Sequence, residues 1–70
     1  MNGKIHNGDN MEIKLFDFEH EEDLEVAVNK FLEEEKNIKV EKISYQVSNF
    51  GINGEQIYSF SCLIVFERNI

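Results

Sequence analysis

An Asn53-Gly54 pair separates two stretches in which large apolar residues alternate with polar or smaller ones. Both residues tolerate the positive φ angles of a type I′ turn, so the pair predicts a two-residue β-hairpin between strands at 38–50 and 56–67. Because such a turn fixes which residues face each other, this dipeptide constrains the fold more than any other feature of the chain.

The register that the turn imposes agrees with the hydrophobic pattern. It places Val47 opposite Phe60 and Tyr45 opposite Cys62, and pairs of this kind stabilise a sheet. A slip of one residue would turn every one of these side chains to the other face. The remaining pairs predicted on this face are Ile43 with Ile64 and Asn49 with Tyr58.

The segment 19–36 predicts an amphipathic helix, because apolar residues recur there at intervals of three and four. Asp17 is the expected N-cap, and Asn37 is expected to end the helix in the left-handed conformation. The helix should cover the face of the hairpin that carries Phe60. The apolar stripe consists of Leu24, Ala27, Val28, Phe31 and Leu32.

A further strand is predicted at 11–18, and its order with the other elements defines the fold. A right-handed crossover makes the first two strands parallel and leaves the third between them. We therefore expect an α+β fold of the β-α-β-β type, with one helix on a three-stranded mixed sheet of strand order 1-3-2. The alternation changes phase after Val40, which predicts a β-bulge near Glu41 and Lys42.

The domain organisation follows from length and composition. Residues 1–10 contain two Asn-Gly pairs and no periodicity, which predicts a flexible N-terminal arm before a single domain at 11–70. The lone Cys62 excludes a disulfide within the chain and favours a reducing cytoplasm. No apolar run reaches the roughly 20 residues of a membrane span.

The chain is acidic, with 14 Asp and Glu against 7 Lys and Arg, and eight of the acidic residues lie between Glu19 and Glu35. Nucleic acids and anionic membranes both require clustered positive charge, so neither is an expected partner. We interpret the acidic segment as a solvated helix face. The alternative is a negative surface that competes with DNA for a basic protein.

The sheet face turned away from the helix combines a hydroxyl-rich centre with an apolar rim. We expect this face either to remain in solvent or to pack against a second copy, since an apolar rim of this size usually marks a contact. A ligand surface is the third possibility, with hydroxyl and amide groups as its polar contacts. The candidate residues are Phe16, Ser44, Gln46, Ser48, Phe50, Ile57, Ser59, Ser61, Leu63 and Val65.

No catalytic residue, metal or cofactor is predicted. His20 should have a capping or structural role, and a metal site with Asp17 and Glu21 is the weaker alternative, because the chain lacks the paired-histidine spacing H-E-x-x-H. Cys62 should point into the core, where a thiol is usually inert. The sequence shows no base positioned beside a hydroxyl and no glycine-rich phosphate loop. We therefore expect that the protein is not an enzyme.

Six motifs stand out between Met11 and Glu67: Phe16-Asp17, His20-Glu21, Asn29, Phe31-Leu32, Tyr45-Gln46-Val47 and Glu55-Gln56-Ile57-Tyr58. Together they resemble a small sporulation protein family of Bacillus and its relatives. Members of that family are made under a mother-cell sigma factor, so the resemblance implies a Gram-positive cytoplasm and supplies no catalytic residues. The element order is also similar to that of dodecins, but the tryptophan on which their flavin stacks is missing.

The leading hypothesis is a non-enzymatic cytoplasmic protein that forms homodimers or higher homo-oligomers and acts by binding. One alternative is a phage-encoded sponge that sequesters a nucleotide signal between subunits, with phosphate contacts from Lys14, Lys39, Lys42 and Arg68. The other is an acidic decoy that inhibits a host protein. Its contacts would come from Glu21, Glu22, Glu25, Glu33 and Glu34.

Overall fold

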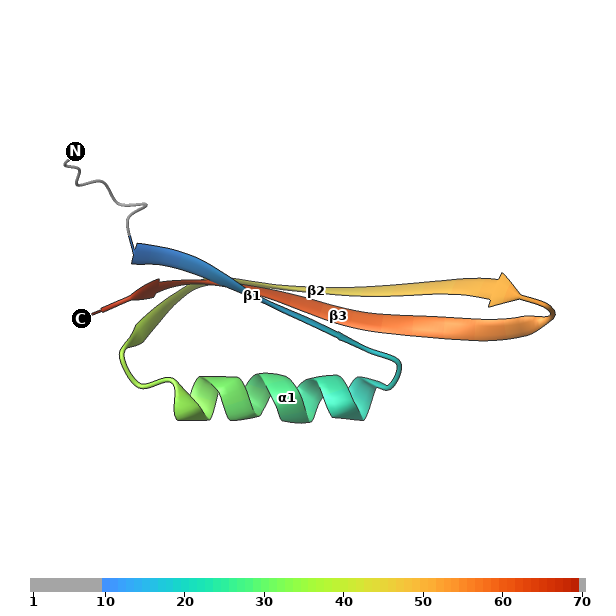
Figure 1. The fold of residues 1–70 in the computed structure, drawn as a ribbon, viewed down its shortest axis with the longest axis horizontal. Helices are drawn as coiled ribbons and strands as arrows, with labels where there is room; N and C mark the ends of the chain where they lie inside the picture. Colours follow the sequence, from blue (N-terminus) through green and yellow to red (C-terminus); the bar gives the residue numbers. More distant parts are fainter. Residues whose placement is uncertain (1–9, 70) are drawn as a thin grey trace.

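The computed structural model describes residues 10–69, in which one helix lies along one face of a three-stranded sheet (Figure 1). The elements are β1 (Met11–Phe18), α1 (Glu21–Glu34), β2 (Ile38–Ile52) and β3 (Glu55–Arg68). The strand order is β1-β3-β2, so the predicted β-α-β-β fold is confirmed. The predicted flexible arm lies outside the described residues, apart from Asn10.

The prediction of a mixed sheet is wrong. The central strand β3 pairs antiparallel with β1 on one side and with β2 on the other. The outer strands β1 and β2 run parallel to each other, but β3 separates them and they form no parallel ladder. Every pair of neighbouring strands in the described sheet is therefore antiparallel.

The hairpin has the predicted turn and register. Asn53 has φ 52° and Gly54 has φ 82°, as a type I′ turn requires. Val47 faces Phe60 as predicted, and the other predicted pairs of the hairpin are also present. The pairing shifts by one residue between Val40 and Lys42, which confirms the β-bulge.

Replacing Gly54 with alanine should lower the free energy of unfolding by about 1 kcal/mol, because an L side chain is strained in the left-handed region. Urea unfolding measures this loss. Gly51→Ala is the matched control, since a Cβ at Gly51 would meet the Glu55 carbonyl oxygen at an ordinary 3.5 Å. Equal stability of the two variants would contradict the assigned turn.

The core lies between α1 and the sheet face that we call the inner face; the opposite face is the outer face. Phe31 of α1 packs edge-to-face on Phe16 of β1 and Phe66 of β3, with ring centroids 6.0 and 5.4 Å apart. Phe60 packs against the same core, so the predicted covering of its face by the helix is confirmed. The buried side chains are Leu24, Cys62, Ile64 and Phe66.

The predicted N-cap is wrong, and α1 begins two residues later than the predicted segment. Asp17 lies within β1, and its carboxylate accepts a hydrogen bond of 2.5 Å from the Ser59 hydroxyl. His20 occupies the N-cap position, and its backbone carbonyl accepts the Leu24 N–H at 3.2 Å. The His20 side chain makes no capping hydrogen bond. Strand pairing of β1 as far as Phe18 therefore determines where the helix can begin.

The C-terminal end of α1 also differs from the prediction. Asn37 has no left-handed backbone; among the described non-glycine residues only Asn53 has a positive φ. The chain leaves the helix at Glu35, which is extended and donates its N–H to the Phe31 carbonyl at 3.0 Å. The Asn37 carbonyl instead accepts the Asn69 N–H at 2.7 Å. Pairing with the end of β3 thus replaces the predicted left-handed cap.

The molecule is elongated, because the hairpin projects beyond the helix (Figure 1). Its radius of gyration is 15.8 Å and its longest extent is 54 Å, whereas a compact domain of this length has a radius of gyration of about 11 Å. Pairing of β1 ends at Phe18 opposite Phe60, so the hairpin continues beyond it as a two-stranded ribbon. Such a shape leaves large parts of the sheet uncovered.

No helix among residues 10–69 has the length and apolarity needed to cross a membrane.

Candidate functional site

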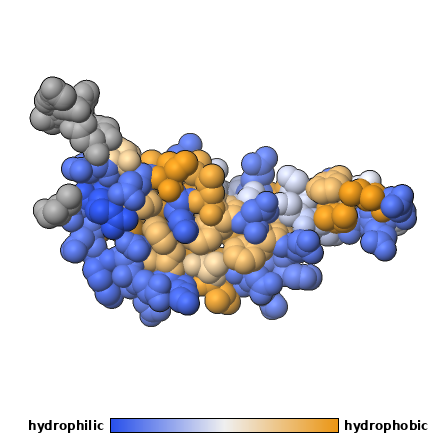
Figure 2. All heavy atoms as spheres, viewed as in Figure 1, coloured by the Kyte–Doolittle hydropathy of each residue, from blue (hydrophilic) through white to orange (hydrophobic). Residues whose placement is uncertain are grey.

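The outer face carries an apolar patch at the end of the sheet where all three strands pair. Leu15 lies opposite Leu63 and Ile13 lies opposite Val65, and we call these four residues the proximal patch. The side chains of Ile13 and Leu15 are 60% and 66% exposed. The helix lies on the inner face, so none of the described elements covers the proximal patch. Figure 2 shows apolar atoms at the surface on this side of the sheet, while the side of α1 is mostly hydrophilic.

A polar centre follows the proximal patch along the outer face. The Ser59 hydroxyl donates to Asp17 at 2.5 Å, and the Ser61 hydroxyl donates to the backbone carbonyl of Gln46 at 3.3 Å. Ser44 and Gln46 line a hollow of about 270 Å³ with Leu15, Ser61 and Leu63. The register places the predicted serines and Gln46 on this face. Asp17, Ile13 and Leu15 were not among the predicted residues, since alternation places the three together on one face of β1 but does not show which face the helix covers.

A second apolar cluster, the distal patch, lies near the hairpin tip. It contains Phe50, which faces Ile57, and the exposed Ile52, which was not among the predicted residues. A hollow lined by Phe50, Ile57 and Asp17 connects this patch to the polar centre. The outer face is therefore apolar at both ends and polar in the middle. All the candidate residues predicted to lie on this face do so, with one exception.

That exception is Phe16, whose predicted place on the outer face is wrong. Phe16 lies opposite Cys62, and its ring packs against Phe31 on the inner face. The reason is the pleat of β1, in which neighbouring side chains point to opposite faces. Since Leu15 and Asp17 point outward, Phe16 between them must point toward the helix.

The inner face is only partly covered, because α1 packs against β1 and β3 and leaves β2 beside it. Ile43, Tyr45 and Val47 of β2 are 50%, 51% and 47% exposed, although their partners in β3 pack in the core. A helix about 10 Å wide spans roughly two strands that lie 4.8 Å apart. We call these three residues the β2 row.

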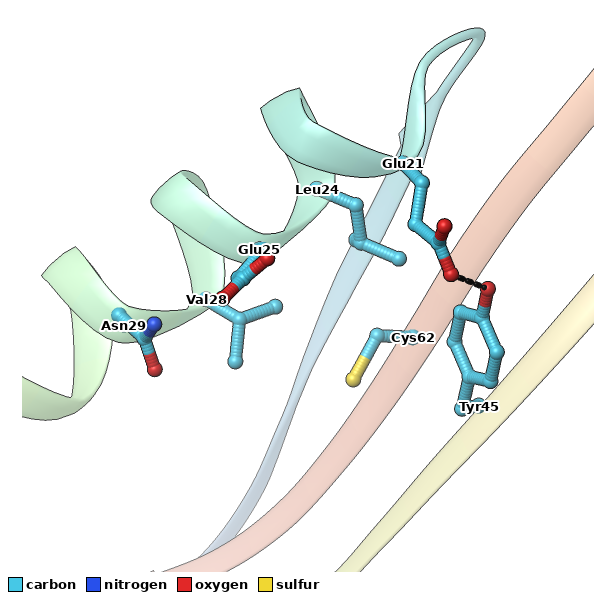
Figure 3. Close-up of a pocket in the computed structure, with 7 residues that line it drawn as sticks. All are labelled: Glu21, Leu24, Glu25, Val28, Asn29, Tyr45 and Cys62. Atoms are coloured by element: carbon cyan, nitrogen blue, oxygen red, sulfur yellow. Dashed lines mark hydrogen bonds between the residues drawn. The ribbon is translucent and has the colours of Figure 1, made fainter.

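A groove of about 280 Å³ lies between α1 and Tyr45, the central residue of the β2 row (Figure 3). Leu24 and Val28 point toward the sheet, and the Cys62 side chain rises from β3 between the helix and Tyr45. The Tyr45 hydroxyl crosses the groove and donates to Glu21 at 2.8 Å. The sequence pattern did not reveal this groove, because alternation shows which face a residue occupies and not how far the helix reaches across it.

Two pKa shifts characterise the groove. The hydrogen bond to Glu21 raises the pKa of the Tyr45 hydroxyl, and partial desolvation adds to this effect. Burial raises the pKa of the Cys62 thiol, which reduces the thiolate fraction at neutral pH. Both groups therefore stay protonated near neutral pH, and Cys62 lacks the activation that a nucleophile needs.

Arg68 links the ends of three elements. Its guanidinium lies 2.8 Å from the Glu12 carboxylate of β1 and 3.0 Å from Glu35 after α1. It also lies over the Phe66 ring, 5.4 Å from the centroid. The arginine is thus held by two carboxylates at the edge of the core.

The four cations considered for phosphate binding do not form one cluster. Arg68 contacts Glu12 and Glu35, and Lys39 lies 3.8 Å from Glu41. Lys14 lies over the Phe16 ring on the inner face, whereas Lys42 is on the outer face opposite Val65. The arrangement of these four cations offers no concentrated positive surface for a nucleotide.

Among residues 10–69 no three His, Cys, Asp or Glu side chains gather closely enough to hold a metal ion.

Replacing Arg68 with glutamine should raise the pKa of Glu12 toward its ordinary value of 4.5, because hydrogen bonds from the guanidinium hold it lower. A lowered pKa in the folded state stabilises the fold above pH 4.5, and this contribution disappears as the pH falls through the lowered pKa. The stability difference between wild type and variant should shrink over that acid range.

A carbon-detected NMR titration of the Glu12 carboxyl measures this pKa. Lys39→Gln removes the same charge from a pair that does not involve Glu12, so that control should leave the titration unchanged. An identical Glu12 titration in wild type and the Arg68 variant would contradict the assigned contact.

Residues 10–69 form a small α+β domain with one helix, and its distinctive features are uncovered apolar surfaces. Residues 10–68 match the profile of the family described as Sporulation protein Cse60. The chain is also 37% identical over 59 residues to sporulation protein Cse60 of Bacillus subtilis (strain 168). The aligned residues cover 83% of this chain and 98% of that relative. The chain therefore belongs to the Cse60 family of sporulation proteins, and the predicted resemblance is confirmed. No solved structure gives a significant match.

Proposed function

We propose that this sporulation-family chain is a non-enzymatic cytoplasmic protein that acts by binding and self-associates through the outer face of its sheet. The observation that carries this proposal is the proximal patch, where Ile13 and Leu15 are mostly exposed on the face opposite α1. Contiguous apolar surface on a small protein usually marks an interaction site. The lone, free Cys62 fits a reducing compartment.

The distribution of charge favours the outer face as the self-contact. The chain has a net charge of −7, and the first turn of α1 alone carries Glu21, Glu22 and Asp23. By contrast, the outward-facing residues of β3 from Ile57 to Val65 are serines and aliphatic residues. Two copies joined by their outer faces would keep their acidic helices on opposite sides of the assembly, which limits repulsion.

The small core supports the same proposal. Four side chains are buried in the described residues, and chains of this size commonly gain stability from a partner subunit. Full burial of a leucine such as Leu15 contributes about 1.5–3 kcal/mol. Two sheets packed face to face, about 10 Å apart, would bury the proximal patches of both copies.

Sedimentation equilibrium over micromolar to millimolar concentrations tests self-association. The proposal predicts that the mass rises from the 8.2 kDa of the single chain toward twice that value. Raising the salt concentration should preserve the association, because apolar contacts are not screened as ion pairs are. A mass of 8.2 kDa at every concentration would reject the proposal.

A further inference from the structure

We propose that the groove between α1 and the β2 row binds an amphipathic helix with a basic flank, supplied by a partner protein. This proposal concerns the inner face and does not depend on self-association through the outer face. It follows from the shape, the apolar lining and the charge of the groove.

The shape of the groove fits a helix lying beside α1. The helix α1 packs on β1 and β3, and the β2 row remains about half exposed next to it. Packed helices lie 8–10 Å apart, so a second helix beside α1 would lie over β2. Its apolar stripe would contact Val28 on one side and Ile43 and Val47 on the other, as helices do in hydrophobic grooves.

The lining provides an apolar floor with an acidic rim. Leu24, Val28 and Cys62 form the floor, and Glu21 and Glu25 stand one turn apart along the helix side of the groove (Figure 3). The hydrogen bond from Tyr45 holds the Glu21 carboxylate at the groove. No lysine or arginine of the described chain is among the lining residues. Basic side chains spaced four residues apart on an incoming helix would match these two glutamates.

A second copy of this chain does not fit the same groove. Its only helix among the described residues begins with Glu21, Glu22 and Asp23, and no basic residue lies in the last turn. Placing that helix beside α1 would bring like charges together, which disfavours association. The charge therefore selects a partner of opposite sign.

The probe is a synthetic peptide about 18 residues long, with leucines at helical spacing and lysines flanking them. Titration into isotope-labelled protein should shift the NMR signals of Val28, Tyr45 and Val47 and leave those of Leu15 unchanged. A matched peptide with glutamate in place of lysine should bind at least about tenfold more weakly, because it reverses the charge complementarity. Equal binding of both peptides would overturn the proposal.

Variants of the protein locate the site. Glu25→Lys should weaken binding of the lysine peptide about tenfold, and Val47→Lys should remove measurable binding, because both place positive charge against the peptide. Val26→Lys is the matched control, since Val26 is 67% exposed on α1 and belongs neither to the groove lining nor to the β2 row. Circular dichroism confirms that each variant is folded.

Three outcomes would contradict the proposal. They are unchanged affinity in Val47→Lys, peptide-induced shifts confined to the outer face, and concentration-dependent shifts of Val28 and Tyr45 without peptide. The last result would mean that a second copy fills the groove. The first two outcomes do not bear on the mass measured by sedimentation. The third would raise that mass, but the shifted residues would lie on the inner face, which distinguishes this association from one through the outer face, so the two proposals can fail separately.

Discussion

Replacing Ile64 with alanine should lower the free energy of unfolding by about 3 kcal/mol, because the change leaves a cavity in the centre of the core. Ile64 is 0% exposed, on the central strand beneath α1. A chain of this size has a total stability of roughly 4–10 kcal/mol, so the loss is severe. Urea unfolding followed by circular dichroism measures it, and Ile64→Val, with an expected loss of about 1 kcal/mol, gives a second value if the alanine variant does not fold.

The matched control is Ile43→Ala. Ile43 lies directly opposite Ile64 in β2, on the same inner face, but it is 50% exposed. The same change there should cost about 1 kcal/mol, since less apolar surface is lost from the core. Equal losses at Ile43 and Ile64 would mean that α1 covers both strands alike, and would remove the basis for the groove.

Replacing Leu15 with lysine should weaken self-association by about 100-fold or more. In a two-fold symmetric dimer each copy would bring one new positive charge into the apolar interface, so the interface would contain two unpaired charges. Leu15 is well exposed on an outer strand of the sheet, so the folded chain should tolerate the change. Sedimentation equilibrium of the variant should give the mass of the single chain at concentrations where the wild type is associated.

Val26→Lys provides the comparison for this variant. It makes the same charge change at an exposed position of α1, away from the outer face, and should associate like the wild type. Association of Leu15→Lys with wild-type affinity would contradict the assignment of the proximal patch as the self-contact. Loss of association in both variants would show that net charge, rather than this patch, controls it.

The sequence predicts most of the sheet because one local signal and one periodic signal agree. Asn53-Gly54 determines the turn, and the alternation of large apolar residues in β2 and β3 independently gives the same register. The bulge near Glu41 is visible as a change of phase in that alternation. The helix is equally clear, because its stripe has a different period from the strands.

The errors arise where tertiary pairing decides the backbone. Asp17 has the chemistry of an N-cap, but pairing of β1 with β3 continues through Phe18 and directs its carboxylate to Ser59. Asn37 can adopt a left-handed conformation, yet its carbonyl is used by Asn69. Local propensity could not predict either outcome, because both depend on residues more than thirty positions away in the chain.

The candidate surfaces were predicted in part, for a geometric reason. Alternation correctly assigned the serines and Leu63 to the outer face. In β1 it separates Phe16 from Leu15 and Asp17, but it does not show which side meets the helix, because both sides carry large apolar residues. The groove was not predictable in this way. It depends on the lateral position of α1 over the sheet, and no periodicity in the sequence encodes that position.

An isotope-filtered NOE measurement on a mixture of carbon-13-labelled and unlabelled chains tests directly whether the outer faces of two copies meet. We expect intermolecular NOEs between the methyl groups of the proximal patch, in particular those of Leu15 and Leu63. Intermolecular NOEs from Val28 or Val47 in their place, or none at millimolar concentration, would contradict this expectation.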